Sequence, residues 1–223
     1  MDKKKILLLN GSNRKKKTSY SFAKAIKDIT ADKGHEANII HIIDYFNQKE
    51  DFNNLKNILI DVDVIGIISP LYVDTLPYTN IWFFEKLSNE LRNQLKGKSF
   101  FAIAQSGFID IKVCKPLIES CRFFAKTTEM KWLGGLSYGG GAVIDGMPIN
   151  ELGKRGEKII AGFTILVEEV LKESSISYKA QDLITFKMPK ILYRPLAMLL
   201  NHNNKKFAKD NGVRDIKRKV YIE

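Results

Sequence analysis

Hydroxyl groups and one arginine gather in a short segment, Gly11–Tyr20, which directly follows an apolar run. Ser12, Thr18 and Ser19 offer hydroxyl groups. Arg14 adds a planar, forked cation, and a helix is expected to begin within the segment, where its first amides are free. Hydroxyls, helix-terminal amides and a guanidinium suit a phosphate monoester dianion. The segment contains neither a P-loop nor a dinucleotide-binding glycine motif, and a polar loop with an ordinary helix cap is the alternative interpretation.

Two later segments have the composition of ligand-binding loops. Ser69–Pro77 holds Tyr72 between two prolines. Such a stiff turn suits a flat heteroaromatic ring, whose edge the backbone amides would address. Gln105–Phe108 is small and polar with an aromatic residue at its end, so its backbone would approach a ligand closely. Each segment is also compatible with a rigid loop whose aromatic side chain only packs.

Metal and cysteine chemistry are not indicated by the sequence. Cys114 and Cys121 are the only cysteines, which excludes a disulfide framework and a cysteine-ligated zinc or iron–sulfur site. Both lie on one face of an expected helix, where packing is far more common than redox chemistry. His35, His41 and His202 lie far apart in sequence. We therefore predict no metal site.

The composition indicates a globular chain whose positive charge lies at its two ends. Its 223 residues are 44% hydrophobic and 27% charged, which fits one sizeable core. Of the net charge of +11, residues 1–17 contribute +6 and residues 179–223 contribute +7, so the body is close to neutral. Nucleic-acid-binding domains usually carry a basic face on the folded body, and we predict no such partner. The apolar run 6–9 is too short to span a membrane, and we expect a soluble, cytoplasmic protein.

Alternating strands and helices are predicted to position the three loops. Short apolar runs predict strands at 6–10, 37–43, 64–68, 99–104 and 131–136. Helical spacing of apolar residues predicts helices at 18–33, 52–59, 79–91, 114–125 and 153–173. This alternation predicts a doubly wound α/β fold, a parallel sheet with helices on both faces. Ligands of such sheets bind beyond the carboxyl ends of the strands, where the three loops are expected.

After Ser174 the alternation stops. Residues 175–188 resemble a linker, and Pro189 is expected to open a last helix, interrupted near Arg194-Pro195. We therefore predict two parts, a domain at 1–174 and a C-terminal extension at 175–223 with a basic amphipathic helix. The helix is expected to pack on its own domain or on a partner subunit.

The order and spacing of the loops resemble the NADPH-dependent FMN reductase family of the flavodoxin-like fold. Gly-Ser-x-Arg, residues 11–14, with the trailing Thr18-Ser19 is similar to the family's FMN-phosphate loop. Residues 70–77, Pro-Leu-Tyr-Val-Asp-x-Leu-Pro, are similar to its isoalloxazine loop, and the triple glycine at 139–141 fits its fifth-strand loop. The resemblance implies bound FMN, a five-stranded sheet of order 2-1-3-4-5 and a homodimer.

The resemblance also implies a role for each loop. The phosphate would be surrounded by Ser12, Arg14, Thr18, Ser19 and Tyr20. The ring would be bordered by Pro70, Leu71, Tyr72 and Val73. The ribityl chain and pyrimidine edge would meet Gln105, Ser106, Gly107 and Phe108.

The activity implied by the family is that of an NAD(P)H oxidoreductase. NADPH or NADH would pass a hydride to FMN, which then reduces a small quinone, nitro, azo or free-flavin acceptor. That step requires no general acid or base, so we predict no catalytic side chain. A flavodoxin-type electron carrier without nicotinamide turnover is the alternative. Carrier flavodoxins are generally acidic, whereas this chain is basic.

Overall fold

The computed structural model describes residues 3–186, 191, 193–213 and 215. The chain divides into two compact units, residues 1–186 and residues 187–223. The candidate loops all belong to the first unit, and each unit is described by itself below.

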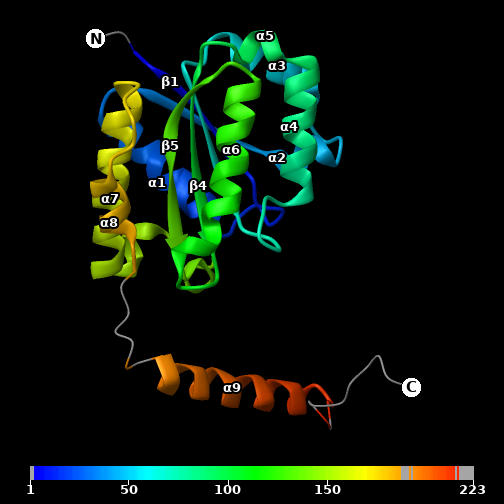
Figure 1. The fold of residues 1–223 in the computed structure, drawn as a ribbon, viewed down its shortest axis with the longest axis vertical. Coiled ribbons are helices and arrows are strands. Elements are labelled where there is room, and N and C mark those ends of the chain that lie inside the picture. The colour runs from blue at the N-terminus through cyan, green and yellow to red at the C-terminus, as the bar shows by residue number, and fades with distance from the viewer. Residues whose placement is uncertain (1–2, 187–190, 192, 214, 216–223) are drawn as a thin grey trace. The chain divides into compact units, whose positions relative to one another are not determined.

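A five-stranded parallel sheet forms the centre of the first unit (Figure 1). Its strands are β1 (Lys5–Asn10), β2 (Glu36–His41), β3 (Val64–Pro70), β4 (Ser99–Ser106) and β5 (Lys131–Gly139). Neighbouring strands follow the order β2-β1-β3-β4-β5, and every pair is parallel. The structure thus confirms the flavodoxin-like topology and each predicted strand.

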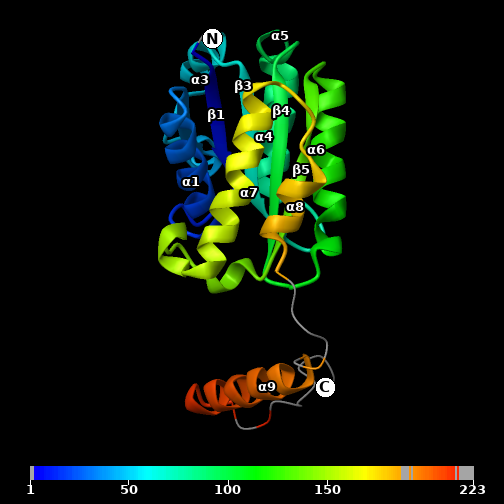
Figure 2. The same ribbon diagram turned by 90° about the vertical axis from the view of Figure 1, so that its left-hand side faces the viewer.

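Helices cover both faces of the sheet. One face carries α1 (Thr18–Asp32), α7 (Lys154–Leu171) and α8 (Tyr178–Ile184), which lie toward the viewer in Figure 2. The other carries α2 (Ile42–Phe46), α3 (Phe52–Ile60), α4 (Tyr78–Glu90), α5 (Arg92–Leu95) and α6 (Lys115–Thr127). Short 3₁₀ turns are η1 (Ile111–Cys114), η2 (Gly141–Val143) and η3 (Ile149–Leu152). Because the side chains of an inner strand alternate between two buried faces, β1, β3 and β4 are largely apolar runs.

The second strand is shorter than predicted. The pattern placed its end at residue 43, but β2 ends at His41 and Ile42 begins α2. Ile42 and Tyr45 are buried in the layer that contains α3 and α4. The apolar run that ends at residue 43 therefore crosses the boundary between β2 and α2, which the spacing of apolar residues alone does not mark.

Residues 175–186, which were predicted as part of a linker, pack on the first unit. Ile176 donates a backbone hydrogen bond to Leu133 on the edge strand β5 (2.7 Å). The Gln181 side chain bonds both the N–H and the C=O of Ser137 (2.8 Å each), as a further strand would. The segment thus covers a sheet edge whose backbone groups would otherwise be unpaired. The division between the two units falls after Phe186 rather than at residue 174.

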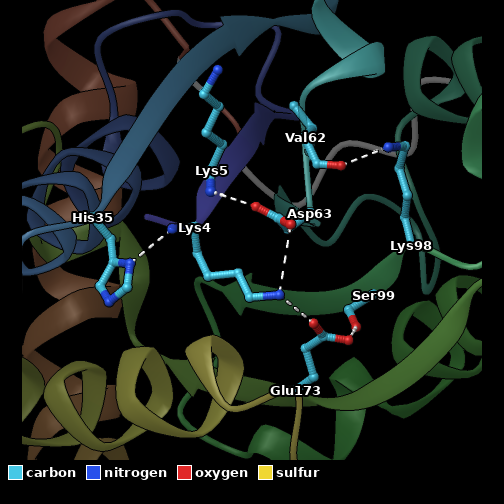
Figure 3. A network of polar contacts seen from close by, with 8 residues as sticks. All are labelled: Lys4, Lys5, His35, Val62, Asp63, Lys98, Ser99 and Glu173. Atoms are coloured by element: carbon cyan, nitrogen blue, oxygen red, sulfur yellow. Dashed lines mark hydrogen bonds and ion pairs between the residues drawn. The ribbon is translucent and has the colours of Figure 1, made fainter. Parts of the chain in front are cut away.

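Charged side chains are paired with one another at the amino ends of the strands (Figure 3). Lys4 Nζ lies 2.6 Å from Glu173 Oε1 and 3.6 Å from Asp63 Oδ1. Asp63 Oδ2 accepts from the backbone N–H of Lys5 (2.7 Å), and Glu173 Oε2 accepts from Ser99 Oγ (3.1 Å). The hydrogen bond to Glu173 raises the pKa of Lys4, and the hydrogen bond from Lys4 lowers the pKa of Glu173. Figure 3 also labels His35, Val62 and Lys98.

The second unit contains one long helix, α9 (Tyr193–Asp210). Its predicted start at Pro189 lies outside the described residues. Among the described residues, no helix is long and apolar enough to cross a membrane.

Candidate functional site

The strands of the sheet all end at the same edge, the lower one in Figure 1. β1 and β3 are neighbours whose chains leave toward opposite faces, because β1 leads to α1 and β3 leads to α4. Loops that diverge in this way open a crevice at the carboxyl ends of the strands. All thirteen predicted cofactor-binding residues lie at this edge, on the ends of β1, β3 and β4 or on the segments that follow them.

The first loop is held in place by hydrogen bonds within the chain. Gly11 donates its N–H to Ile68 on β3 (2.9 Å). Asn10 Oδ1 accepts from the backbone of Ser12 (3.2 Å), and Asn10 Nδ2 donates to the Lys15 carbonyl (3.0 Å). Ser12 Oγ accepts from the N–H of Arg14 (3.2 Å). The Ser12 side chain therefore supports the loop from inside, while the Arg14 side chain is exposed.

The start of α1 carries a buried hydroxyl without a partner. Ser19 is fully buried, and its Oγ has no hydrogen-bond partner among the described residues. Lys17 precedes the helix but provides no side-chain cap, so the first amides of α1 are not satisfied by a capping side chain. An unpaired buried hydroxyl costs about 1–3 kcal/mol. A ligand with several acceptor oxygens would satisfy both the hydroxyl and the amides.

Two of the lysines in the first loop form ion pairs within the chain. Lys15 pairs with Asp44 of α2, and Lys17 Nζ lies 2.8 Å from Asp145 Oδ1. The hydrogen bond from Lys17 lowers the pKa of Asp145. Arg14 and Lys16 are exposed and form no ion pair within 4 Å among residues 3–186. These two cations are therefore the ones available to an anionic ligand.

The second loop is a tight turn with strained backbone. Tyr72 and Thr75 exchange backbone hydrogen bonds of 2.9 and 3.1 Å. Between them, Val73 and Asp74 have φ angles of 45° and 66°. Positive φ is unusual for a β-branched residue and costs about 1–3 kcal/mol. The Val73 side chain is 96% exposed at the tip of the turn, so the turn presents an apolar group to solvent.

Hydrogen bonds tie the first three loops together. Leu71 donates its N–H to the carbonyl of Gln105 (2.8 Å), which joins the second loop to the third. Thr79 Oγ1 donates to Asn13 Oδ1 (2.7 Å), which joins the start of α4 to the first loop. Thr18 Oγ1 donates to the carbonyl of Gly141 (2.7 Å). The Thr18 hydroxyl therefore binds the triple-glycine loop.

The third loop packs closely on the triple-glycine loop. Ser106 Oγ accepts from the N–H of Phe108 (3.0 Å), and Phe108 accepts from the N–H of Gly140 (2.8 Å). A Cβ on Gly139 would lie 2.2 Å from the Ile109 carbonyl oxygen. Gly140 has a φ of 73°. Only glycine therefore fits at position 139. Phe108 remains 70% exposed at the rim of this edge.

Tyr20 follows Ser19 in α1, and its side chain lies against β2. Its ring centroid is 5.7 Å from that of His41 on β2. Tyr20 also lines a cavity of about 540 Å³ together with Ser21, Lys24 and Asn150. Its contact with a phosphate stays a prediction, as do the contacts of the other twelve residues with a cofactor.

The structure identifies two further residues at this edge. Asn80 of α4 is fully buried, and its Nδ2 donates to Ser69 Oγ (2.9 Å). A Cβ on Gly11 would lie 2.3 Å from this Nδ2, so Asn80 occupies the space that Gly11 leaves open. Arg155 of α7 donates to the carbonyl of Gly140 (3.3 Å), and its guanidinium lies over the Tyr138 ring (5.2 Å). In the sequence, the only local sign of a role for Asn80 is that it is a polar residue in the first turn of a helix. No local pattern in the sequence indicates a role for Arg155.

Buried polar atoms without partners are concentrated at this edge. Among the described residues they are Ser19 Oγ, Ser21 Oγ, Asp44 Oδ1, Asn80 Oδ1, Tyr138 Oη and Arg155 Nε. Each belongs to the carboxyl end of a strand or to the helical segment that follows one. Asp44 Oδ1 is the exception, because this atom is ion-paired with Lys15 Nζ. The edge therefore holds donors and acceptors that the chain itself does not use.

The two cysteines lie in the hydrophobic core, Cys114 just before α6 and Cys121 within it. Cys114 and Cys121 are both fully buried in the layer that contains α4 and α6. Burial raises the pKa of the Cys114 thiol to about 11 and raises the pKa of Cys121 further. Thiols so far from ionisation at neutral pH are poor nucleophiles, and the predicted packing role is confirmed.

A known protein family matches the part of the chain that contains the candidate loops. The NADPH-dependent FMN reductase family matches residues 4–111, just under half of the chain. The match runs from β1 through the third loop, and it confirms the resemblance predicted from the sequence. The family match indicates an FMN-dependent oxidoreductase. No curated protein matches this sequence.

Three solved structures share the fold at low sequence identity. A flavone reductase is 12% identical with a TM-score of 0.58, over 83% of this chain and 72% of its own. An apo NADH:FMN oxidoreductase is 14% identical with a TM-score of 0.57, over 80% and 94%. General stress protein 14 of Treponema denticola, in complex with FMN, is 13% identical with a TM-score of 0.56, over 75% and 99%. These likenesses establish the fold.

Proposed function

We propose that this chain, in which residues 4–111 match the NADPH-dependent FMN reductase family, binds FMN at the carboxyl edge of its sheet. The bound flavin would accept a hydride from NADPH or NADH and pass it to a quinone, nitro, azo or free-flavin acceptor. The observation that carries the proposal is the buried, unpartnered Ser19 hydroxyl at the start of α1. The same segment holds the exposed Arg14, and the start of α1 has no side-chain cap, which together give the donor set that a phosphate monoester needs.

Two residues would bind the phosphate directly, and two would position them. Ser19 Oγ and the first amides of α1 would donate to phosphate oxygens, and Arg14 would supply the charge. Ser12 would hold the backbone of Arg14 through the hydrogen bond that its Oγ accepts. Thr18 would hold the helix start against the triple-glycine loop through its bond to Gly141.

The second and third loops would hold the flat ring and exclude water from one of its faces. The Tyr72–Thr75 turn is fixed by two backbone hydrogen bonds. Val73 exposes apolar surface on this turn, and Phe108 does so on the third loop. Such side chains gain by covering an aromatic ring. FMN supplies the two-electron chemistry when bound, and the chain's part is to bind it, orient it and leave one face open to the nucleotide. The family resemblance also makes a homodimer part of this proposal, and light scattering of the FMN-loaded protein tests it.

An absorbance experiment tests the proposal. The purified protein is mixed with FMN, desalted, and then titrated anaerobically with NADPH and separately with NADH. Retained bands near ~450 and ~375 nm that bleach within seconds are the expected result. Retained FMN that resists both nucleotides would favour the electron carrier instead. Failure to retain FMN, with no binding in a subsequent titration, would refute the cofactor assignment.

A further inference from the structure

Helix α9 presents an apolar stripe along one side. Leu200 and Phe207 are seven residues apart and so lie on the same face of the helix. They are 52% and 71% exposed, and Leu199 beside them is 56% exposed. Single exposed apolar residues are ordinary, but several on one face of a long helix mark a surface that is normally covered.

The opposite side of α9 is basic. Lys205 and Lys209 are four residues apart and share a face, with Lys206 and His202 close to it. No acidic residue occurs between Asp182 and Asp210. Residues 187–223 as a whole hold ten basic and three acidic side chains, a net charge of +7. Leu200 and Phe207 therefore face one way and Lys205 and Lys209 the other. Leu199 and Lys206, seven residues apart, share the flank between these two faces, and the exposed Met198 lies on the side of Lys205.

We propose that α9 binds the surface of an anionic membrane. A helix with Leu and Phe on one face and Lys on the other lies in the lipid interface, with its apolar face among the acyl chains and its cations at the headgroups. At 18 residues α9 is about 27 Å long, and it is not apolar enough to span a bilayer. This inference uses no residue of the candidate FMN site and stands without the proposed function.

Charge separates this occupant from the two alternatives. A second copy of the chain offers little electrostatic attraction, because residues 1–186 carry 26 basic and 22 acidic side chains, a net of +4. A nucleic acid would attract the lysines but leave Leu199, Leu200 and Phe207 exposed to water. Of these three occupants, the anionic lipid surface is the one that satisfies both faces of the helix.

Vesicle flotation with the full chain tests the proposal. The protein is mixed with vesicles of phosphatidylcholine alone, or of phosphatidylcholine with 30% phosphatidylglycerol, at 0.1 M and 0.5 M salt. We expect binding to the anionic vesicles at 0.1 M salt, with a loss of at least tenfold in 0.5 M salt or with neutral lipid. Equal partition into both vesicle types, or into neither, would overturn the proposal.

Matched variants locate the binding to α9. Lys205→Glu/Lys206→Glu/Lys209→Glu should lower the partition coefficient at least tenfold, as should Leu200→Ser/Phe207→Ser. The control for the triple-lysine variant reverses the charge of three exposed lysines of the first unit: Lys49→Glu, Lys56→Glu and Lys126→Glu. Both variants change the net charge by the same amount. The control should bind within twofold of the unaltered chain. An equal loss in the control would make the attraction a property of net charge and overturn the assignment to α9. Binding of a DNA duplex that survives Leu200→Ser/Phe207→Ser, without vesicle binding, would favour a nucleic-acid partner.

Discussion

The two edges of the same sheet differ in whether their buried polar groups are paired. At the amino edge, Lys4, Asp63 and Glu173 are bound to one another and to backbone groups (Figure 3). At the carboxyl edge, Ser19 Oγ and Asn80 Oδ1 are buried with no hydrogen-bond partner in the described part of the chain, and Val73 adopts a strained φ. Unpaired buried groups and strained backbone both cost folding free energy. This contrast supports the proposal that the carboxyl edge is the binding site of the chain.

The strongest way to break this comparison is to remove the unpaired donors. Arg14→Ala/Ser19→Ala should weaken FMN binding by at least about 100-fold, since two charge-assisted hydrogen bonds are lost and each contributes about 1.5–3 kcal/mol. Thermal stability without FMN should stay the same or rise, because an unsatisfied hydroxyl is removed. Fluorescence titration of FMN measures the affinity, and calorimetry measures the stability.

A control for this variant exists two residues along the same helix. Ser21 is also buried with an unpartnered Oγ, but it lines the cavity shared with Lys24 rather than the helix start. Ser21→Ala/Lys24→Ala should bind FMN within twofold of the unaltered chain. Comparable losses in both variants would mean that α1 responds as a whole, and the phosphate assignment would then fail.

A second variant tests the close packing of two loops at the carboxyl edge. Gly139→Ala would place a Cβ 2.2 Å from the Ile109 carbonyl oxygen, which is backbone and cannot rotate away. We expect unfolding free energy to fall by about 1–3 kcal/mol. Gly107→Ala is the control, because its nearest neighbour would be Ala142 Cβ at 3.8 Å, and it should change stability by less than about 0.5 kcal/mol. Denaturant unfolding of both variants measures their unfolding free energies. Equal values would show that the loop moves to accommodate a Cβ at position 139 and that the close packing is not required.

The same contrast explains what the sequence predicted and what it did not. β1, β3 and β4 could be predicted because a strand buried on both faces is a continuous apolar run. The loops could be placed because parallel strands all end at one edge. Asn80 and Arg155 escaped prediction because their roles depend on neighbours distant in sequence, Gly11 and Gly140. The packing of residues 175–186 escaped for the same reason, since Gln181 acts on Ser137.

At the amino edge a substitution should affect stability alone. Glu173→Gln keeps the size of the side chain but removes the charge that pairs with Lys4. We expect a loss of about 0.5–1 kcal/mol in unfolding free energy, because both side chains are partly exposed. FMN affinity should not change. A drop in FMN affinity with this variant would mean that the two edges are coupled, and the comparison would lose its basis.

The smallest effect is the pH dependence of the amino edge. The pKa of Glu173 lies below its ordinary value of 4.5, so its contribution is present above pH 4.5 and is lost as the pH falls through the lowered pKa. The pKa of Lys4 lies above its ordinary value of 10.5, so its contribution is present below pH 10.5 and is lost as the pH rises further. The stability difference between the unaltered chain and Glu173→Gln should therefore be flat from about pH 5 to pH 10 and shrink on both sides. Denaturant unfolding across this range measures it. A stability difference that instead changed between about pH 5 and pH 10 would mean that the Lys4–Glu173 ion pair is not its source.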